Sequence, residues 1–155
     1  MDLTREDIDR IRESYHRVSA DSQRAGEVFY DYLFEKAPET RALFLADMQT
    51  QAAKLTNTLG TIVAELQSFG TMAPLVEDLA LRHVAYGVLP EHYDAVGAAL
   101  LEMLERVTPG GLDPTTRAAW EAAYAALSGT MIDYAYDRAV SPLGARRMGD
   151  GAERL

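Results

Sequence analysis

The stretch 79-LALRHVAYGVLPEHYDAVGAALL-101 joins two segments of helical spacing across a short break. Leu79 and His83 are four residues apart, in step with the apolar residues before them, which places the imidazole on the apolar face near the end of the first helix. Gly87 and Pro90 separate this helix from the next one. An inward histidine at such a position is either a hydrogen-bonded core residue or a ligand, and the spacing alone does not decide between the two.

The rest of the chain shows the same periodicity, because apolar residues recur at steps of three and four rather than in alternation. This pattern predicts an all-α protein. Thr4 with Asp7 forms a capping start for the first helix, and Asp113 followed by Pro114 starts the last one. The predicted helices cover about 5–20, 22–36, 48–68, 74–86, 91–107 and 114–139, with a short turn over 38–44.

Composition and charge exclude several classes of function. The chain has 155 residues, with 15 Lys and Arg against 24 Asp and Glu, which gives a net charge of −9 at pH 7. Such a charge argues against a nucleic acid or an anionic membrane surface as partner. The absence of cysteine excludes disulfides, thiolate metal sites and cysteine nucleophiles. The longest uncharged stretches, such as 66–76, are much shorter than the roughly 20 residues that a membrane span requires.

The length fits one domain, and we expect it to occupy residues 1–140, followed by a flexible tail over 141–155. The amino terminus lacks a basic segment followed by an apolar one, so we expect a cytoplasmic protein.

The other two histidines give weaker signals than His83. Glu13 and His16 have the Glu-x-x-His spacing of di-iron bundles, but the sequence has no second motif of this kind, so we expect His16 at the surface. His92 lies in the first turn of its helix, where a polar interaction with the helix end is expected. No nucleophile elbow, phosphate loop or dinucleotide motif indicates an enzyme.

A second group of candidate residues is ambiguous when each is taken singly. Gln51 and Leu55 stack on one face of their helix, with Lys54 toward the edge of that face. Tyr30 lies in an apolar segment, where its hydroxyl must find a partner. Taken singly, the tyrosine is best explained by core packing with a hydrogen-bonded hydroxyl, and the glutamine and lysine by ordinary solvation.

Taken together, these motifs resemble the globin family, and specifically the bacterial single-domain haemoglobins related to the globin part of flavohaemoglobins. The resemblance covers about residues 8–135 and follows the family's order and spacing. The motifs are Phe29-Tyr30-x-x-Leu33-Phe34-x-x-x-Pro38, Leu43-Phe44, Gln51-x-x-Lys54-Leu55, Arg82-His83-x-x-Tyr86-Gly87-Val88-x-x-x-His92-Tyr93-x-x-Val96-Gly97-x-x-Leu100-Leu101 and Trp120-x-x-x-Tyr124.

The resemblance implies a globin fold, with three helices packed over three around one haem b. The family's fourth helix is expected to be short or absent, because only six residues separate Phe44 from Gln51. His83 takes the place of the proximal iron ligand, and its other ring nitrogen is expected to donate to the Leu79 carbonyl. Tyr93 matches the tyrosine behind that histidine.

On the distal side of the haem, Tyr30 and Gln51 match the family's polar pair, and Leu55 matches the apolar residue above the iron. A Tyr30 hydroxyl that donates a hydrogen bond should slow the dissociation of oxygen. Phe44 matches the aromatic residue that lies against the porphyrin.

The remaining cofactor contacts that the resemblance implies come from Lys54, Arg82 and Tyr86. Lys54 and Arg82 are at positions able to reach the haem propionates, whose negative charge a cation would balance.

The function that follows from the resemblance is reversible binding of oxygen, nitric oxide and carbon monoxide, for storage, delivery or scavenging. The alternative is a nitric oxide dioxygenase with a separate reductase, because the chain stops before any flavin- or nicotinamide-binding domain. A flavohaemoglobin glutamate that backs the proximal histidine corresponds here to Ala135, which argues against peroxidase-like chemistry. A cofactor-free, protein-binding helical bundle is a third possibility, and a monomer and a homodimer both remain open.

Overall fold

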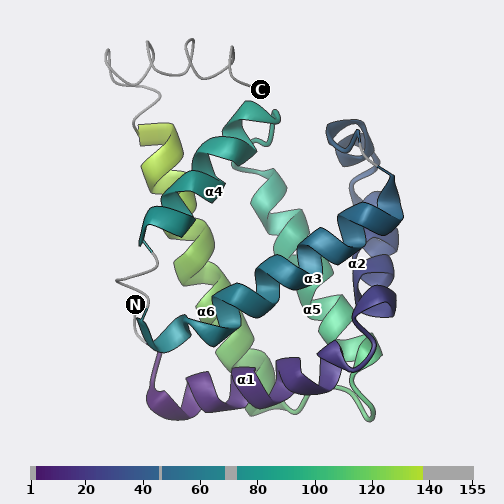
Figure 1. The fold of residues 1–155 in the computed structure, drawn as a ribbon, viewed down its shortest axis with the longest axis vertical. Helices are drawn as coiled ribbons and strands as arrows, with labels where there is room; N and C mark the ends of the chain where they lie inside the picture. Colours follow the sequence, from purple (N-terminus) through teal and green to yellow (C-terminus); the bar gives the residue numbers. More distant parts are fainter. Residues whose placement is uncertain (1–2, 46, 69–72, 138–155) are drawn as a thin grey trace.

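The computed structural model describes residues 3–45, 47–68 and 73–137, and this part of the chain contains helices and no strand, as predicted. In chain order the elements are α1 (Arg5–Ser19), α2 (Ser22–Lys36), the 3-10 helix η1 (Pro38–Leu43), α3 (Met48–Ala64), α4 (Ala73–Ala85), α5 (His92–Val107), α6 (Pro114–Ile132) and the π-helical turn η3 (Asp133–Asp137) (Figure 1).

The first helix shows how the sequence pattern becomes structure. Thr4 Oγ1 accepts a hydrogen bond from the Asp7 N–H at 3.0 Å, and the Asp7 carboxylate accepts one from the Thr4 N–H at 3.2 Å, which is the predicted capping box. Its buried apolar stripe consists of Ile8, Ile11, Tyr15 and Val18. The Tyr15 hydroxyl donates to the Thr56 carbonyl at 2.5 Å and so ties α1 to α3.

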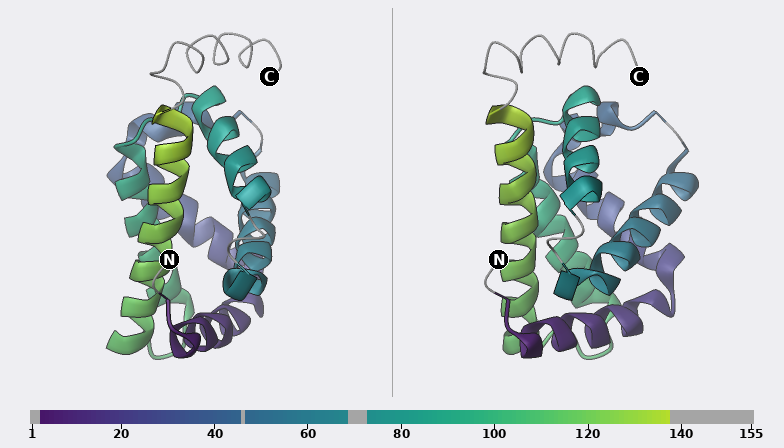
Figure 2. Two further views of the ribbon diagram at one scale, coloured as in Figure 1. Left: turned by 90° about the vertical axis from the view of Figure 1, so that its left-hand side faces the viewer. Right: turned by 60° about the vertical axis from the view of Figure 1, so that its left-hand side comes forward.

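The helices form two layers, with α1, α3 and α4 in one and α2, α5 and α6 in the other (Figures 1 and 2). Between the layers, α2 packs against α3, and α6 packs against both α1 and α4. Trp120 on α6 donates from Nε1 to Ser14 Oγ on α1 at 3.0 Å, inside the core. This is the three-over-three arrangement that the sequence motifs imply.

The structure departs from the predicted boundaries at the ends of two helices. α3 ends at Ala64, four residues earlier than predicted, because the Glu65 N–H shares its hydrogen bond between the Thr61 and Ile62 carbonyls (3.2 and 3.1 Å) and a 3-10 turn follows. α6 leaves α-helical geometry at Ile132 and continues as η3 to Asp137.

Several expectations lie at or beyond the edge of the described structure. No helix occurs between η1 and α3 among the described residues there, in agreement with the expected loss of one helix. The predicted end of the last helix at Ala139 and the tail over 141–155 fall outside the described residues. Among the helices that are described, none combines the length and the apolar character needed to cross a bilayer.

The crossing of α2 over α3 depends on Gly26. A Cβ atom at this position would lie 2.5 Å from the Ala52 Cβ and 2.8 Å from the Ala52 carbonyl oxygen, closer than van der Waals contact permits. The two helix backbones therefore touch at Gly26 and Ala52, and both residues are buried.

Replacing Gly26 with alanine would place a methyl group against backbone atoms that cannot move aside. We expect Gly26→Ala to lower the free energy of unfolding by about 1–3 kcal/mol, as overpacked cores do. Gly129→Ala on α6 is the matched control, since a Cβ there meets no atom within 4 Å and alanine should gain up to about 1 kcal/mol of helix propensity. Denaturant unfolding of the two variants checks the expectation, and equal stability of Gly26→Ala and the unmodified protein would contradict it.

Candidate functional site

His83 is held in one ring orientation by its own helix. Its Nδ1 lies 2.7 Å from the Leu79 carbonyl oxygen, one turn earlier on α4. The Leu79 carbonyl can only accept, so Nδ1 carries the proton and Nε2 keeps its lone pair. Burial lowers the pKa of His83 below its usual value, and the bond to Leu79 opposes this shift only in part. The structure thus confirms the predicted Leu79 partner and presents a neutral imidazole with a free Nε2.

The end of α4 fixes the backbone of His83 as well. Gly87 adopts a left-handed conformation with φ of +93°, which a residue with a side chain rarely adopts. The Gly87 N–H donates to the Val84 carbonyl and the Val88 N–H donates to the His83 carbonyl, both at 3.0 Å. This pair of bonds is a Schellman motif, and it anchors the carbonyl of His83 itself.

Tyr93 on α5 lies beside His83, with ring centroids 6.2 Å apart and planes inclined by 27°. The Tyr124 hydroxyl on α6 donates to the Tyr93 carbonyl at 2.6 Å. Gly97 makes room for this contact, because a Cβ there would lie 2.7 Å from the Tyr124 ring. Contacts with two other helices, α4 and α6, therefore hold Tyr93 beside His83.

The Tyr93 hydroxyl itself is buried and has no hydrogen-bond partner among the residues that the structure describes. Burial raises the pKa of Tyr93 to about 12, and the neighbouring Tyr136 phenol adds to the shift. Ala135, which the sequence resemblance assigns to the position of a flavohaemoglobin glutamate, is fully buried. The side chain of Asp133 is exposed. Among the described residues, no group of three or more acidic, histidine or cysteine side chains could hold a metal ion.

Sequence reasoning missed the contribution of Tyr136. Its hydroxyl donates to the carbonyl of Val88, in the corner that follows α4. The residue belongs to η3, whose wider turn alters the helical register that a period of 3.6 assumes. No sequence signal predicts such a turn.

Tyr30 and Gln51 meet where α2 of one layer packs against α3 of the other. The Gln51 Nε2 donates to the Tyr30 hydroxyl oxygen at 3.1 Å, so the proton of that hydroxyl stays available for another acceptor. Burial raises the pKa of Tyr30 above its usual value, against the smaller opposite effect of Gln51. Tyr30 packs edge-on against Phe44, with ring centroids 5.1 Å apart. Leu55, one turn after Gln51, is half-buried against the core.

The remaining predicted contacts lie at the surface. Lys54 is exposed, and Tyr86 is 57% exposed. Arg82 is also exposed and pairs with Asp78, its Nε 3.0 Å from the carboxylate. The other histidines match their predictions: His16 is exposed, and His92 Nδ1 accepts from the Leu89 N–H at 3.0 Å at the start of α5.

The two clusters thus come from different pairs of helices. Tyr30 and Gln51 belong to α2 and α3, whereas His83 and Tyr93 belong to α4 and α5. In the described structure, α3 and α4 are not among the closely packed helix pairs. Each of the two helices carries half-buried apolar residues, such as Leu55 and Val84, that a flat apolar group between them would cover.

Comparison with protein families and individual proteins agrees with this geometry. The family model described as Globin matches residues 27–131. A flavohaemoprotein of Vibrio cholerae is 28% identical over 134 residues, which cover 84% of this chain and 34% of that protein. An uncharacterised globin-like protein of Aquifex aeolicus is 33% identical over 103 residues, which cover 66% of this chain and 73% of that protein. The chain spans about a third of the length of the flavohaemoproteins that it matches.

Solved structures with a similar fold include a bacterial globin from Campylobacter jejuni, with a TM-score of 0.75 and 28% identity over 86% of this chain and 97% of that one. An engineered carbene transferase from Rhodothermus marinus gives a TM-score of 0.76 and 25% identity, over 89% and 97% of the two chains. Ferric myoglobin from Aplysia limacina, at 19% identity over 85% of this chain and 98% of that one, shares the fold with a TM-score of 0.76.

The orphaned Tyr93 hydroxyl leads to a prediction about stability. A buried hydroxyl without a partner costs about 1–3 kcal/mol, so we expect Tyr93→Phe to leave the free energy of unfolding unchanged or to raise it. Tyr124→Phe is the matched control, because it removes a real hydrogen bond and should lower the free energy of unfolding by about 1 kcal/mol. Denaturant unfolding measures both changes. A marked loss of stability in Tyr93→Phe would mean that its hydroxyl has a protein partner in solution.

Proposed function

Because the chain belongs to the globin family, we propose that it binds one haem b through His83 and reversibly binds oxygen and other diatomic gases on the opposite side. The observation that carries this proposal is the state of His83: a neutral imidazole with Nδ1 occupied by Leu79 and Nε2 free. This is the form in which histidine ligates iron. When bound, the haem supplies a ferrous iron with an open coordination position for a diatomic gas.

The donor set and the apolar surroundings both suit a haem. His83 offers the single strong ligand, and the half-buried apolar residues on α3 and α4 would cover the faces of a flat macrocycle. Phe44 and Leu55 are the aromatic and the aliphatic member that we assign to the distal face. Tyr93 supports the His83 ring from behind.

On the proximal side, the chain's own residues hold the ligand nitrogen in place. The bond from His83 Nδ1 to the Leu79 carbonyl sets the rotation of the ring, and the bond from the Val88 N–H sets the backbone beneath it. Such outer partners orient a ligating histidine and raise its basicity. A carbonyl partner does so less strongly than a carboxylate, and Ala135 provides no carboxylate.

On the distal side, the hydroxyl of Tyr30 is the hydrogen-bond donor for the gas ligand. Gln51 already donates to the Tyr30 oxygen, which leaves the phenolic proton free and polarises it. The phenol stays protonated over the physiological pH range because burial raises its pKa. A donor of this kind retains a polar ligand such as oxygen better than carbon monoxide.

We assign the exposed residues Lys54, Arg82 and Tyr86 to the edge of the haem. For Arg82 to reach a propionate, its ion pair with Asp78 must open, and this costs little because both side chains are more than half exposed. Positive side chains there would balance the propionates in a chain whose net charge is −9.

A second function, nitric oxide dioxygenase, is favoured by the similarity to flavohaemoproteins. This chain matches about a third of their length, and turnover would need a reductase to return the iron to the ferrous state. The buried Ala135 weighs toward gas binding, because no carboxylate increases the electron donation of His83. Steady-state nitric oxide consumption with an added reductase separates the two functions.

The test of the proposal is removal of the iron ligand. We expect His83→Ala to lose haem to an acceptor protein more than about tenfold faster, since metal sites weaken by such factors even when outer partners are lost. His16→Ala, which alters an exposed histidine, should retain haem like the unmodified protein. The Soret absorption band followed over time measures the loss.

A glycine variant distinguishes ligation from misfolding. His83→Gly with added imidazole should regain the ferric and ferrous spectra of the unmodified protein, because free imidazole can occupy the vacated position. Unchanged haem retention in His83→Ala would refute the ligand assignment. If the purified chain shows no Soret band and takes up no added haem, the alternative of a cofactor-free helical bundle is favoured instead.

The distal donor leads to a separate prediction. Tyr30→Phe removes one hydrogen bond, worth about 0.5–1.5 kcal/mol, so oxygen should dissociate up to about tenfold faster. Carbon monoxide should dissociate at nearly the original rate, because it is a weaker acceptor. Tyr32→Phe serves as the control on the same helix, where the ring faces Lys36 and Arg106 instead. Stopped-flow measurements that gave the same oxygen rate for Tyr30→Phe would show that the hydroxyl does not donate.

A further inference from the structure

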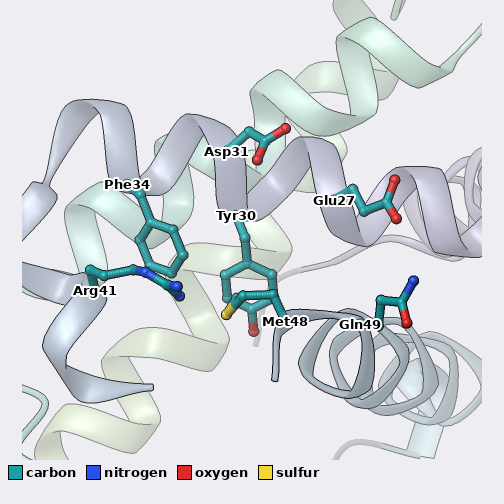
Figure 3. Close-up of a pocket in the computed structure, with 7 residues that line it drawn as sticks. All are labelled: Glu27, Tyr30, Asp31, Phe34, Arg41, Met48 and Gln49. Atoms are coloured by element: carbon teal, nitrogen blue, oxygen red, sulfur yellow. The ribbon is translucent and has the colours of Figure 1, made fainter. Parts of the chain in front are cut away.

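A pocket of about 350 Å³ opens at the surface where α2, η1 and the start of α3 meet. Its volume is about ten times the 30 Å³ or so that a water molecule occupies in the liquid. Figure 3 shows the side chains that line it, which are Glu27, Tyr30, Asp31, Phe34, Arg41, Met48 and Gln49. The pocket therefore lies between α2 and α3, and its lining residues do not include any from α4, the helix of His83.

Tyr30 connects this pocket to the proposed gas site. Its side chain is only 5% exposed, yet it lines the pocket, so it forms part of the inner wall. Its hydroxyl is bonded to Gln51, the other member of the distal pair. The wall that a small molecule meets at the inner end of the pocket is thus the residue that we expect to bind the gas.

Met48, at the start of α3, lines the same pocket as Tyr30, and both side chains are drawn in Figure 3. The residue is half-buried and packs against the core, so it is neither free in solvent nor locked inside. Met48 is therefore the flexible apolar side chain in the lining of the pocket.

The backbone of Met48 is fixed, whereas its side chain can move. Asp47 caps α3 by accepting from the N–H groups of Gln49 and Thr50, both at 3.1 Å, so the first turn of the helix is anchored. Methionine is unbranched and has three rotatable side-chain bonds, and such side chains change rotamer in picoseconds to nanoseconds near the surface.

The other side of the pocket is more rigid. The Phe34 ring packs against Phe44, with centroids 5.6 Å apart, and the Arg41 guanidinium lies over the Phe34 ring at 5.1 Å. These contacts hold Phe34 and Arg41 in place. The charged residues at the rim, Glu27, Asp31 and Arg41, are exposed. A neutral diatomic molecule can pass them without stripping their hydration, whereas a larger apolar ligand cannot.

We propose that this pocket is the portal through which diatomic gases reach Tyr30, and that Met48 is its gate. The inference rests on the proposed gas-binding function and adds the route of access to it. A gate alters the barrier that the ligand crosses and leaves the free and bound end states as they were. Association and dissociation must then change by the same factor, with the equilibrium affinity preserved.

The experiment compares three substitutions at one position in the haem-loaded protein. Met48→Ala shortens the gate, and we expect the carbon monoxide association and dissociation rate constants to rise together by at least about threefold. Met48→Phe fills the opening and should lower both rate constants together. Met48→Leu, of similar volume, should stay close to the unmodified protein and controls for the change of residue type. Flash photolysis measures association, and stopped-flow ligand replacement measures dissociation.

The pattern of the two rate constants decides the outcome. Unchanged rates in both Met48→Ala and Met48→Phe would overturn the portal. A change in dissociation alone would also overturn it, because Met48 would then act on the bound ligand. A chain that takes up no haem would refute the proposed function and the portal together. A normal response to Tyr30→Phe combined with unchanged Met48 variants would refute the portal alone.

A second measurement does not depend on gas kinetics. Xenon enters apolar openings of this size, and methionine methyl groups labelled with carbon-13 report its presence by a shift of their NMR signal. In the carbon monoxide form of the protein we expect xenon to shift the Met48 signal progressively. The signal of Met103, which is fully buried on α5, serves as the internal reference. A Met48 signal that moves no more than that of Met103 would show that small apolar molecules do not use the pocket, and would overturn the proposal.

Discussion

The hydrogen bond between His83 Nδ1 and the Leu79 carbonyl is the interaction on which the rest of the site depends. It decides which ring nitrogen carries the proton, and so which one is free to ligate. Three further features support it: the burial that keeps the ring neutral, the Val88 N–H that holds the His83 carbonyl, and the left-handed Gly87 that makes this return of the chain possible. The end of α4 thus fixes the tautomer and the orientation of His83 without a bound cofactor.

Each side of the site contains a buried tyrosine, and the two hydroxyl groups differ in their hydrogen bonding. The Tyr30 hydroxyl oxygen accepts a hydrogen bond from Gln51 Nε2, and the phenolic proton stays free to donate to a ligand. The Tyr93 hydroxyl finds no hydrogen-bond partner within the described structure, and the phenol of Tyr136 lies in its neighbourhood. The pair Tyr30 and Gln51 thus offers a free donor, whereas His83 has only a carbonyl partner. Under the proposed function, this asymmetry favours a protein that holds a gas over one that activates it.

Much of this arrangement could be predicted from the sequence, because the features concerned are local. The capping box of Thr4, the boundaries of α2 and the Leu79 partner of His83 all follow from spacings of three and four residues. The early end of α3, the π-helical η3 and the contact of Tyr136 with Val88 could not be predicted, because they depend on how distant helices settle against one another. The pocket beside Met48 could not be predicted either, because residues from α2, η1 and α3 line it together.

The contact between Gly26 and Ala52 has a consequence beyond stability. Gly26 stands one turn before Tyr30 on α2, and Ala52 directly follows Gln51 on α3. The point where the two backbones touch therefore sets the distance between Tyr30 and Gln51. A single methyl group at this crossing would retune the distal hydrogen bonds without touching any of the atoms that form them. Ligand affinity in this chain is thus open to adjustment, by selection or by design, through the volume of a residue that no ligand ever meets.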